Sequence, residues 1–348
     1  MKSFISRHST ESASPPRYTP QQEVELARLD SNSTAPPPYA DEENAPPTSG
    51  TFRPTVHFQI QTTGKPWLSL PLPQRPEPIP VFALQPTDTT NLTTTPQLTS
   101  TRPERSSGSC YLTHHTNNNT TASTTTYRFG PNRPPIVRLF SPHNPPLPAT
   151  TRDRLLFSKD TTTNNNNDDE DAAAAGAWDT FTINSLGLLT RAVGFRSRLG
   201  TFQWRYASRR ERHAAAASAA LAGCGVREVA SLLVLERVVR VACDGTSSSS
   251  SSSSRAGGKE EEVRTVVAQF VRGEGTRTPG SGASTAGNGG RLVMDLGAWE
   301  GEGVDGKGEG EMAVLMVVTT CLVMLKREVD RRRAQQIAIM AGAAGGGS

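Results

Sequence analysis

The longest strongly hydrophobic run lies near the end of the chain, from Met312 to Leu325, and contains only two polar residues, Thr319 and Thr320. Hydrophobic side chains occupy every side of the helix that this run predicts, so the helix must be enclosed all round by protein or by lipid. About 14 residues at 1.5 Å per residue span roughly 21 Å, which is shorter than the roughly 30 Å hydrocarbon core of a bilayer. The pattern therefore favours a helix in a protein core. A short single-pass membrane anchor over residues 312–325 and an interfacial helix are the alternatives.

Shorter segments before this run alternate between hydrophobic and polar residues, which is typical of β-strands. The segments with the most regular alternation or richest in strand-forming residues are 56–60, 200–206, 231–241, 263–272 and 290–296, and less regular ones lie within 101–112, 127–140 and 178–189. Many short strands followed by one wholly hydrophobic helix predict a mainly β fold. We expect a closed antiparallel β-barrel around a buried C-terminal helix, because a closed sheet has no edges and its interior can bury a helix on all sides.

The composition divides the chain into a tail and a domain. Residues 1–50 are rich in Pro, Ser and Thr and poor in hydrophobic residues, so we expect a disordered tail that cannot bury enough surface to offset chain entropy. Residues 51–348 are expected to form the barrel domain. Low-complexity insertions in surface loops are predicted near residues 73–100, 113–126, 158–177, 244–262, 273–290 and 301–310.

The predicted tail carries two copies of the pattern Pro-Pro-x-Tyr, which is the ligand of WW domains. The paired prolines favour a polyproline II helix that docks on an aromatic groove at low entropic cost, and the tyrosine supplies an amphipathic anchor. Two copies make chance a weaker explanation than one copy would. The predicted WW-binding residues are Pro15, Pro16, Tyr18, Pro36, Pro37 and Tyr39.

The net charge of +4 is modest, but arginines cluster at two places. Such clusters can contact anionic phospholipid, and the alternative is that they are solvated surface. The candidate lipid-contacting residues are Arg209, Arg210, Arg212, Arg331, Arg332 and Arg333. No nucleic-acid-binding module is recognisable, so we expect no nucleic-acid partner.

The sequence gives little support for an enzyme. Its four cysteines lie far apart, and no pair has the spacing of metal ligands. Gly301 to Gly306 formally matches a dinucleotide fingerprint, but the acidic residues within and after it would repel a pyrophosphate. We therefore expect no catalytic residue, metal, cofactor or small-molecule substrate. The tryptophans at positions 67, 178, 204 and 299 are expected in the barrel core or at strand ends.

Four blocks of the sequence resemble those of fungal members of the tubby-like group, which includes tubby C-terminal domains, LURP-one-related proteins and phospholipid scramblases. The blocks are 64–70, 105–110, 202–206 and 320–332. The resemblance would cover residues 51–348, and it implies a barrel around a buried helix. Tubby domains bind phosphoinositides, but their ligand residues cannot be matched here one by one.

These observations together predict a non-enzymatic adaptor. Its barrel would recognise a target or a membrane, and its tail would recruit WW-domain proteins such as a HECT-type ubiquitin ligase. The first alternative is a phospholipid-binding or scramblase-like protein whose tail is incidental, and the second is the short single-pass membrane protein. Because the N-terminus lacks the long hydrophobic segment of a signal peptide, we expect a cytoplasmic protein. Peripheral association with a membrane is the alternative to a fully cytoplasmic location.

Overall fold

The computed structural model describes the barrel domain in several stretches of the chain. The described residues are 52–72, 76–84, 95–104, 108–115, 120–128, 133–141, 176–187, 190–218, 221, 226, 228–242, 260–299 and 306–345. The predicted tail and the WW-binding residues lie outside them.

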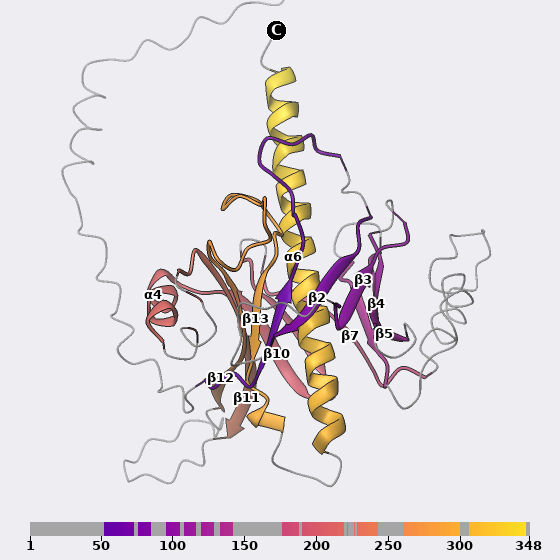
Figure 1. The fold of residues 1–348 in the computed structure, drawn as a ribbon, viewed down its shortest axis with the longest axis vertical. Helices are drawn as coiled ribbons and strands as arrows, with labels where there is room; N and C mark the ends of the chain where they lie inside the picture. The colour runs from indigo at the N-terminus through magenta and orange to yellow at the C-terminus, as the bar shows by residue number, and fades with distance from the viewer. Residues whose placement is uncertain are drawn as a thin grey trace, which may run out of the picture. The chain divides into compact units, whose positions relative to one another are not determined.

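The domain is mainly β, with thirteen strands, two α-helices and a short 3-10 helix in the described residues (Figure 1). The strands are β1 (Val56–Ile60), β2 (Ile79–Leu84), β3 (Leu98–Thr101), β4 (Cys110–His114), β5 (Thr121–Thr126), β6 (Ile136–Leu139), β7 (Asp179–Thr182), β8 (Asn184–Ser185), β9 (Val193–Ser197), β10 (Gly200–Tyr206), β11 (Ser231–Ala242), β12 (Glu260–Arg272) and β13 (Gly290–Met294). The helices are α4 (Arg209–Ala217), η2 (Gly297–Trp299) and α6 (Gly306–Gly345).

All strand pairs are antiparallel and belong to one sheet, in the order β7-β6-β5-β4-β3-β2-β1-β13-β12-β11-β10-β9-β8. The two outer strands, β7 and β8, follow each other in the chain with only Ile183 between them, so the chain itself brings the two edges together. Across this seam the rings of Phe181 and Phe195 stack with centroids 5.1 Å apart. The Asp179 carboxylate accepts a hydrogen bond of 2.9 Å from the backbone N–H of Arg198. The sheet is therefore a nearly closed barrel.

Alternation along the strands separates an inner core from an outer one. On β10, Phe202 and Trp204 are fully buried, whereas Thr201 between the strand start and Phe202 faces solvent. Leu233 and Leu235 of β11 belong to the inner core. Their neighbours on the opposite face belong to a smaller cluster that also contains Ala215 of α4, so α4 covers the outside of this part of the sheet. This second layer explains why β13 is buried along its whole length.

Helix α6 runs through the barrel (Figure 1), and its residues from Met312 to Leu325 are buried apart from the partly buried Val314. The two polar side chains in this stretch are satisfied by strands. The hydroxyls of Thr319 and Ser123 are 2.7 Å apart, and Thr320 accepts a hydrogen bond of 3.0 Å from the Trp204 indole. Protein thus encloses the hydrophobic run of residues 312–325. No helix in the described part of the chain is long and apolar enough to cross a membrane.

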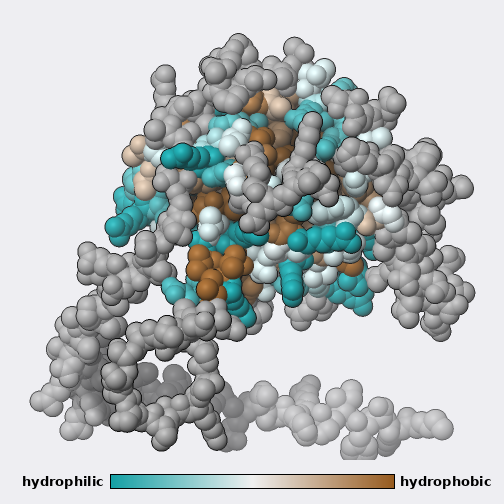
Figure 2. Space-filling model, turned by 90° about the horizontal axis from the view of Figure 1, so that it is seen from below, coloured by the Kyte–Doolittle hydropathy of each residue, from teal (hydrophilic) through white to brown (hydrophobic). Residues whose placement is uncertain are grey.

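Helix α6 begins at the lower end of the barrel in Figure 1, and its C-terminal part extends well beyond the strands. Figure 2 views the lower end and shows hydrophobic residues gathered among hydrophilic ones. The helix has 40 residues, far more than the hydrophobic run of 312–325 that predicted it. The turns after Leu325 are rich in Arg, Gln and Ala, which are good helix formers, and they contain no long hydrophobic run.

Several predicted insertions contain regular structure, so their description as loop insertions was wrong. Residues 73–100 include β2 and most of β3, and residues 113–126 include β5. β5 has the sequence Thr-Ala-Ser-Thr-Thr-Thr, and all but its last residue are buried. Threonine is β-branched and favours strands, and a hydroxyl can be buried when it finds a partner, as Ser123 does on α6. Two further predicted insertions, 244–262 and 301–310, overlap the starts of β12 and α6.

The alanine tract at 214–217 forms the last turn of α4. The helix begins with a capping box. The Ser208 hydroxyl accepts from the Glu211 backbone N–H at 3.3 Å, and the Glu211 carboxylate accepts from the Ser208 backbone N–H at 2.7 Å. The Ser-x-x-Glu pattern before an alanine run is a helix-start signal that could have predicted this element.

Candidate functional site

A largely buried ion pair lies where α6 leaves the barrel, around Glu328. Arg272 of β12 donates two hydrogen bonds to the Glu328 carboxylate, of 2.9 and 2.6 Å. The Tyr206 hydroxyl donates to the same carboxylate, and so does the backbone N–H of Gly287 at 2.9 Å. Arg272 also donates to the side-chain oxygen of Asn288 at 3.1 Å. The helix is thereby fixed at this end to β10, β12 and the loop before β13.

Burial and ion pairing shift the pKa of Glu328 in opposite directions. Burial raises the pKa of Glu328, but the charge and hydrogen bonds of Arg272 outweigh that effect, so the pKa lies below its ordinary value. Burial, followed by the nearby Glu328 carboxylate, raises the pKa of the Tyr206 hydroxyl. At neutral pH the cluster is therefore a buried ion pair with a protonated tyrosine beside it. Such a cluster locks the geometry and offers no free base.

A small cavity of about 40 Å³ lies beside the same stretch of α6. Its lining includes Arg102, Cys110, Tyr127 and Lys326, and the Lys326 ammonium lies 4.3 Å from the centroid of the Tyr127 ring. A neighbouring cavity of about 210 Å³ shares Arg102 with it and is also lined by Glu77. The lining thus contains both cations, Arg102 and Lys326, and a carboxylate, Glu77. These charges favour neither an anionic nor a cationic ligand.

The thiol and the phenol that line the small cavity are held in their neutral forms. Burial raises the pKa of the Cys110 thiol, and it raises the pKa of Tyr127 well above its ordinary value. A thiol is a nucleophile only as the thiolate, which a raised pKa disfavours. Within the described residues no group of three or more His, Cys, Asp or Glu side chains could hold a metal ion.

Beyond the barrel, residues 64–72 cross the protruding part of α6 (Figure 1). The segment starts at Gly64, whose φ of +67° and close approach to the Ala286 carbonyl oxygen leave no room for a side chain. The next residue, Lys65, forms a two-way backbone bridge with Ala286, with hydrogen bonds of 2.7 and 3.0 Å. This bridge fixes the segment to the loop before β13.

Three polar side chains then hold the segment through its carbonyl oxygens. The Lys65 ammonium donates to the carbonyls of Leu70 and Leu72 at 2.7 and 3.2 Å. Gln336 of α6 donates to the carbonyls of Pro66 and Trp67 at 3.2 and 2.7 Å. Arg333 donates to the carbonyl of Pro71 at 2.8 Å. The polar backbone of the segment is thus turned inward.

The apolar side chains of the segment are turned outward. Trp67, Leu68, Leu70 and Leu72 are all exposed, and Leu68 is 96% exposed. The expectation that all four tryptophans lie in the core or at strand ends is therefore wrong for Trp67. Trp204 and Trp299 are buried, and Trp178 packs at the border of the core. The sequence signal was a leucine at every second position, 68, 70 and 72, in a segment that Pro71 interrupts; a central strand does not tolerate such a proline.

The structure places the predicted cluster Arg331 to Arg333 beside this segment. The Arg332 guanidinium lies 4.4 Å from the centroid of the Trp67 ring, and Arg333 bonds the Pro71 carbonyl. All three arginines are partly buried. They follow the Glu328 cluster by one turn, at the point where α6 leaves the strands.

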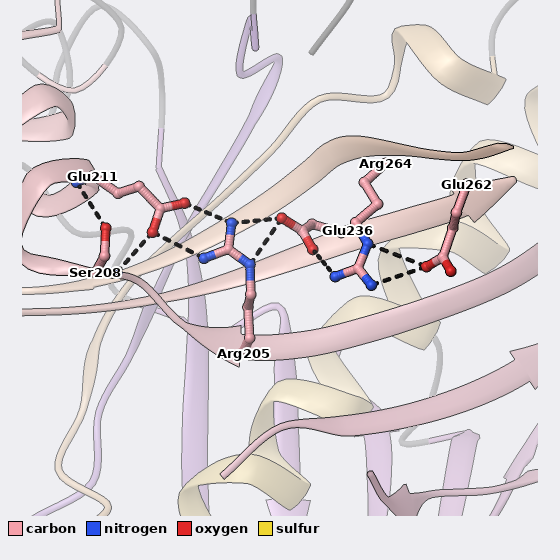
Figure 3. A network of polar contacts seen from close by, with 6 residues as sticks. All are labelled: Arg205, Ser208, Glu211, Glu236, Glu262 and Arg264. Atoms are coloured by element: carbon pink, nitrogen blue, oxygen red, sulfur yellow. Dashed lines mark hydrogen bonds and ion pairs between the residues drawn. The ribbon is translucent and has the colours of Figure 1, made fainter. Parts of the chain in front are cut away.

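The other predicted cluster lies on a different element and has a different setting. Arg209 and Arg210 are exposed on α4, whereas Arg212 donates to the Ala230 carbonyl at 2.8 Å. Glu211, between them in sequence, pairs with Arg205 of β10 (Figure 3). The two arginine clusters do not form one patch, because α4 covers the outer face of the sheet and residues 331–333 lie on α6.

Figure 3 shows the ion-pair network into which α4 is tied. Arg205 donates to Glu211 and to Glu236 of β11, with a shortest distance to Glu236 of 2.6 Å. Arg264 of β12 lies 3.6 Å from the other Glu236 oxygen and 2.9 Å from Glu262. Glu236 is buried and follows directly on the register shift of the β11–β12 pair. The network joins three strands and α4, which is a structural role.

Comparison of the chain with protein-family models, with curated proteins and with solved structures gives no match.

Proposed function

We propose that this chain is a non-enzymatic adaptor of tubby-like architecture. Its N-terminal segment recruits a WW-domain protein, such as a HECT-type ubiquitin ligase, and its barrel domain recognises the target or membrane to which that protein is brought. The observation that carries the proposal is the pair of Pro-Pro-x-Tyr motifs, at residues 15–18 and 36–39.

The spacing of the motifs supports engagement of two WW domains by one chain. A flexible segment of about 21 residues has a root-mean-square span of roughly 25 Å. Linked motifs convert the second binding step into an intramolecular one, which can strengthen binding by a factor of about 100 or more when the geometry allows it. A tandem WW module is therefore a better partner for this chain than a single WW domain.

The arrangement of the barrel is consistent with recognition by an outer surface. Helix α6 fills the interior, and the two cavities described above measure about 40 and 210 Å³. Most pockets for small molecules are larger, at about 300–1,000 Å³. The buried Glu328 cluster and the neutral Cys110 and Tyr127 fit a rigid scaffold.

Calorimetric titration of the full chain with a tandem WW module that binds Pro-Pro-x-Tyr peptides tests the proposal. Tyr18→Ala or Tyr39→Ala alone should weaken binding at least tenfold because one of two linked contacts is lost. The double variant should abolish measurable binding. Pro46 and Pro47 provide a matched control, since they form a proline pair that Thr48 and Ser49 follow in place of a tyrosine.

Substituting both control prolines by alanine should leave the affinity unchanged. The adaptor proposal fails if the double tyrosine variant binds the tandem module as tightly as the parent chain does.

A further inference from the structure

Exposed hydrophobic side chains gather at one place in the described residues. The described residues include ten exposed large hydrophobic residues, and seven of them belong to two segments that touch each other. Four lie in the segment 67–72. The other three, Ile337, Ile339 and Met340, lie on the last turns of α6. We call these seven residues the apolar tip. Exposed hydrophobic groups that cluster in this way mark interaction sites, whereas scattered ones need no explanation.

Contacts between the two segments make the tip one surface. Gln336 is buried and bonds the Trp67 carbonyl, and Arg332 stacks on the Trp67 ring. Residues three and four apart on a helix share a face, so Gln336 places Ile339 and Met340 next to the segment it holds.

The backbone of the segment is prepared for an environment without water. Carbonyl oxygens of five of its residues, Pro66, Trp67, Leu70, Pro71 and Leu72, accept hydrogen bonds from Lys65, Arg333 or Gln336. A backbone group that enters lipid without a partner costs several kcal/mol, and these groups have partners within the protein. A solvent-exposed loop has no need of this arrangement, because water satisfies its carbonyls.

The charged residues next to the apolar tip indicate which kind of partner it binds. Arg331, Arg332 and Arg333 border it on the side of the barrel, and from Ala334 to Gly345 the helix contains no charged residue. Asp330, the exposed carboxylate that precedes these arginines in α6, is paired with Lys326. A basic collar followed by tryptophan, leucine and isoleucine matches the anionic headgroups and the acyl boundary of a bilayer. A second copy of the chain is a poor occupant, since symmetric pairing would bring like charges together.

From this arrangement we infer that the apolar tip inserts into the interface of anionic membranes, with residues 331–333 at the level of the headgroups. The inference rests on the proposed role of the barrel domain as a recognition module and names its partner. It concerns insertion of a surface and assigns no specific lipid pocket.

Binding of the full chain to vesicles tests the inference, with neutral phosphatidylcholine vesicles compared with vesicles containing 30% phosphatidylserine. The chain should sediment with the anionic vesicles and much less with neutral ones, and added salt should weaken its binding. Leu68→Ser with Leu70→Ser should weaken binding at least tenfold. Val239→Ser with Val241→Ser is the matched control, because these valines of β11 are exposed to a similar extent as Trp67 and lie outside the tip.

Trp67 reports the position of the tip directly, because Trp204 and Trp299 are buried and Trp178 is partly covered. Its emission should shift to shorter wavelength on anionic vesicles and be quenched by brominated acyl chains. A Trp67→Phe variant should lose both signals. Thermal unfolding of every variant establishes that the barrel is intact.

Three results would overturn the inference: no binding to anionic vesicles, equal binding by the two serine variants, or a dimer that only the Leu68 and Leu70 substitutions dissociate. The Tyr18→Ala, Tyr39→Ala double variant should bind vesicles like the parent chain. Loss of WW binding and loss of membrane binding are thus separate outcomes.

Discussion

The indole nitrogen of Trp204 donates a hydrogen bond of 3.0 Å to the hydroxyl of Thr320, inside the barrel. Both residues are fully buried, and the bond joins β10 to the middle of α6. Thr320 in turn donates to the Met316 carbonyl at 2.8 Å. A helix that is hydrophobic on all sides has few features that fix its rotation, and this contact supplies one.

Replacing Thr320 by valine should lower the free energy of unfolding by about 1–3 kcal/mol, because the buried indole N–H loses its acceptor while the shape is kept. In a Trp204→Phe background the same replacement should cost much less, since the donor is absent. Urea unfolding of the four proteins measures the coupling. A cost of Thr320→Val that is the same in both backgrounds would mean that the hydrogen bond contributes nothing.

Replacing Met316 by aspartate should prevent folding of the barrel. Met316 is fully buried in the inner core, and an unpaired buried carboxylate costs several kcal/mol, which is comparable to the stability of a whole domain. Ala334→Asp is the matched control, because Ala334 is exposed on the protruding part of α6. Circular dichroism and thermal unfolding should show a folded control and an unfolded core variant. A cooperative transition in Met316→Asp would contradict enclosure of the helix.

The Glu328 ion pair predicts a loss of stability in acid. The pKa of Glu328 is lowered on folding, so the unfolded chain takes up a proton more readily than the folded one. The stabilisation by this carboxylate is complete above its ordinary pKa of about 4.5 and is lost as the pH falls through the lower folded value. The difference in unfolding free energy between the parent and Glu328→Gln should therefore shrink below pH 4.5. A difference that stays constant from pH 6 to pH 3 would refute this assignment.

Arg205 should matter more for stability than Arg264, although both pair with Glu236. Arg205 donates two hydrogen bonds to Glu236, whereas Arg264 lies 3.6 Å away and is more exposed. Arg205→Met should cost about 2–3 kcal/mol because it leaves a buried carboxylate poorly paired, and Arg264→Met should cost less than about 1 kcal/mol. Adding Glu236→Leu to Arg205→Met should recover part of the loss in denaturant unfolding. Equal costs of the two arginine substitutions would contradict this ranking.

Much of the barrel could be predicted from alternation and from the hydrophobic run. The expected strands at 56–60 and 200–206 coincide with β1 and β10, and the enclosure of residues 312–325 is confirmed. Two strands were not predicted: β2, whose hydrophobic residues lie in a proline-rich stretch, and β5, which is built mainly from threonine. Burial of polar residues in β5 depends on partners far away in the chain. Ser123 in β5 is an example, since its partner Thr319 lies 196 residues later.

The candidate site was predictable only in part. The arginines at 331–333 were identified from charge alone, but their role depends on residues 64–72, which pack on α6 after a separation of more than 260 residues. The buried Arg272–Glu328 pair gave no local signal, because each residue looks like an ordinary surface charge in its own segment. Tryptophan is usually buried, so the exposure of Trp67 was not predicted. It follows from the hydrogen bonds of Lys65 and Gln336, which turn the backbone of the segment inward and its side chains outward.

Flotation of a tandem WW module with vesicles containing phosphatidylserine, in the presence and absence of the full chain, tests the central claim most directly. The account predicts that the module floats only when the chain is present. It further predicts that Tyr18→Ala with Tyr39→Ala leaves the chain on the vesicles without the module, whereas Leu68→Ser with Leu70→Ser leaves both in solution. A module that remains unbound beside the parent chain on every vesicle composition would contradict the account.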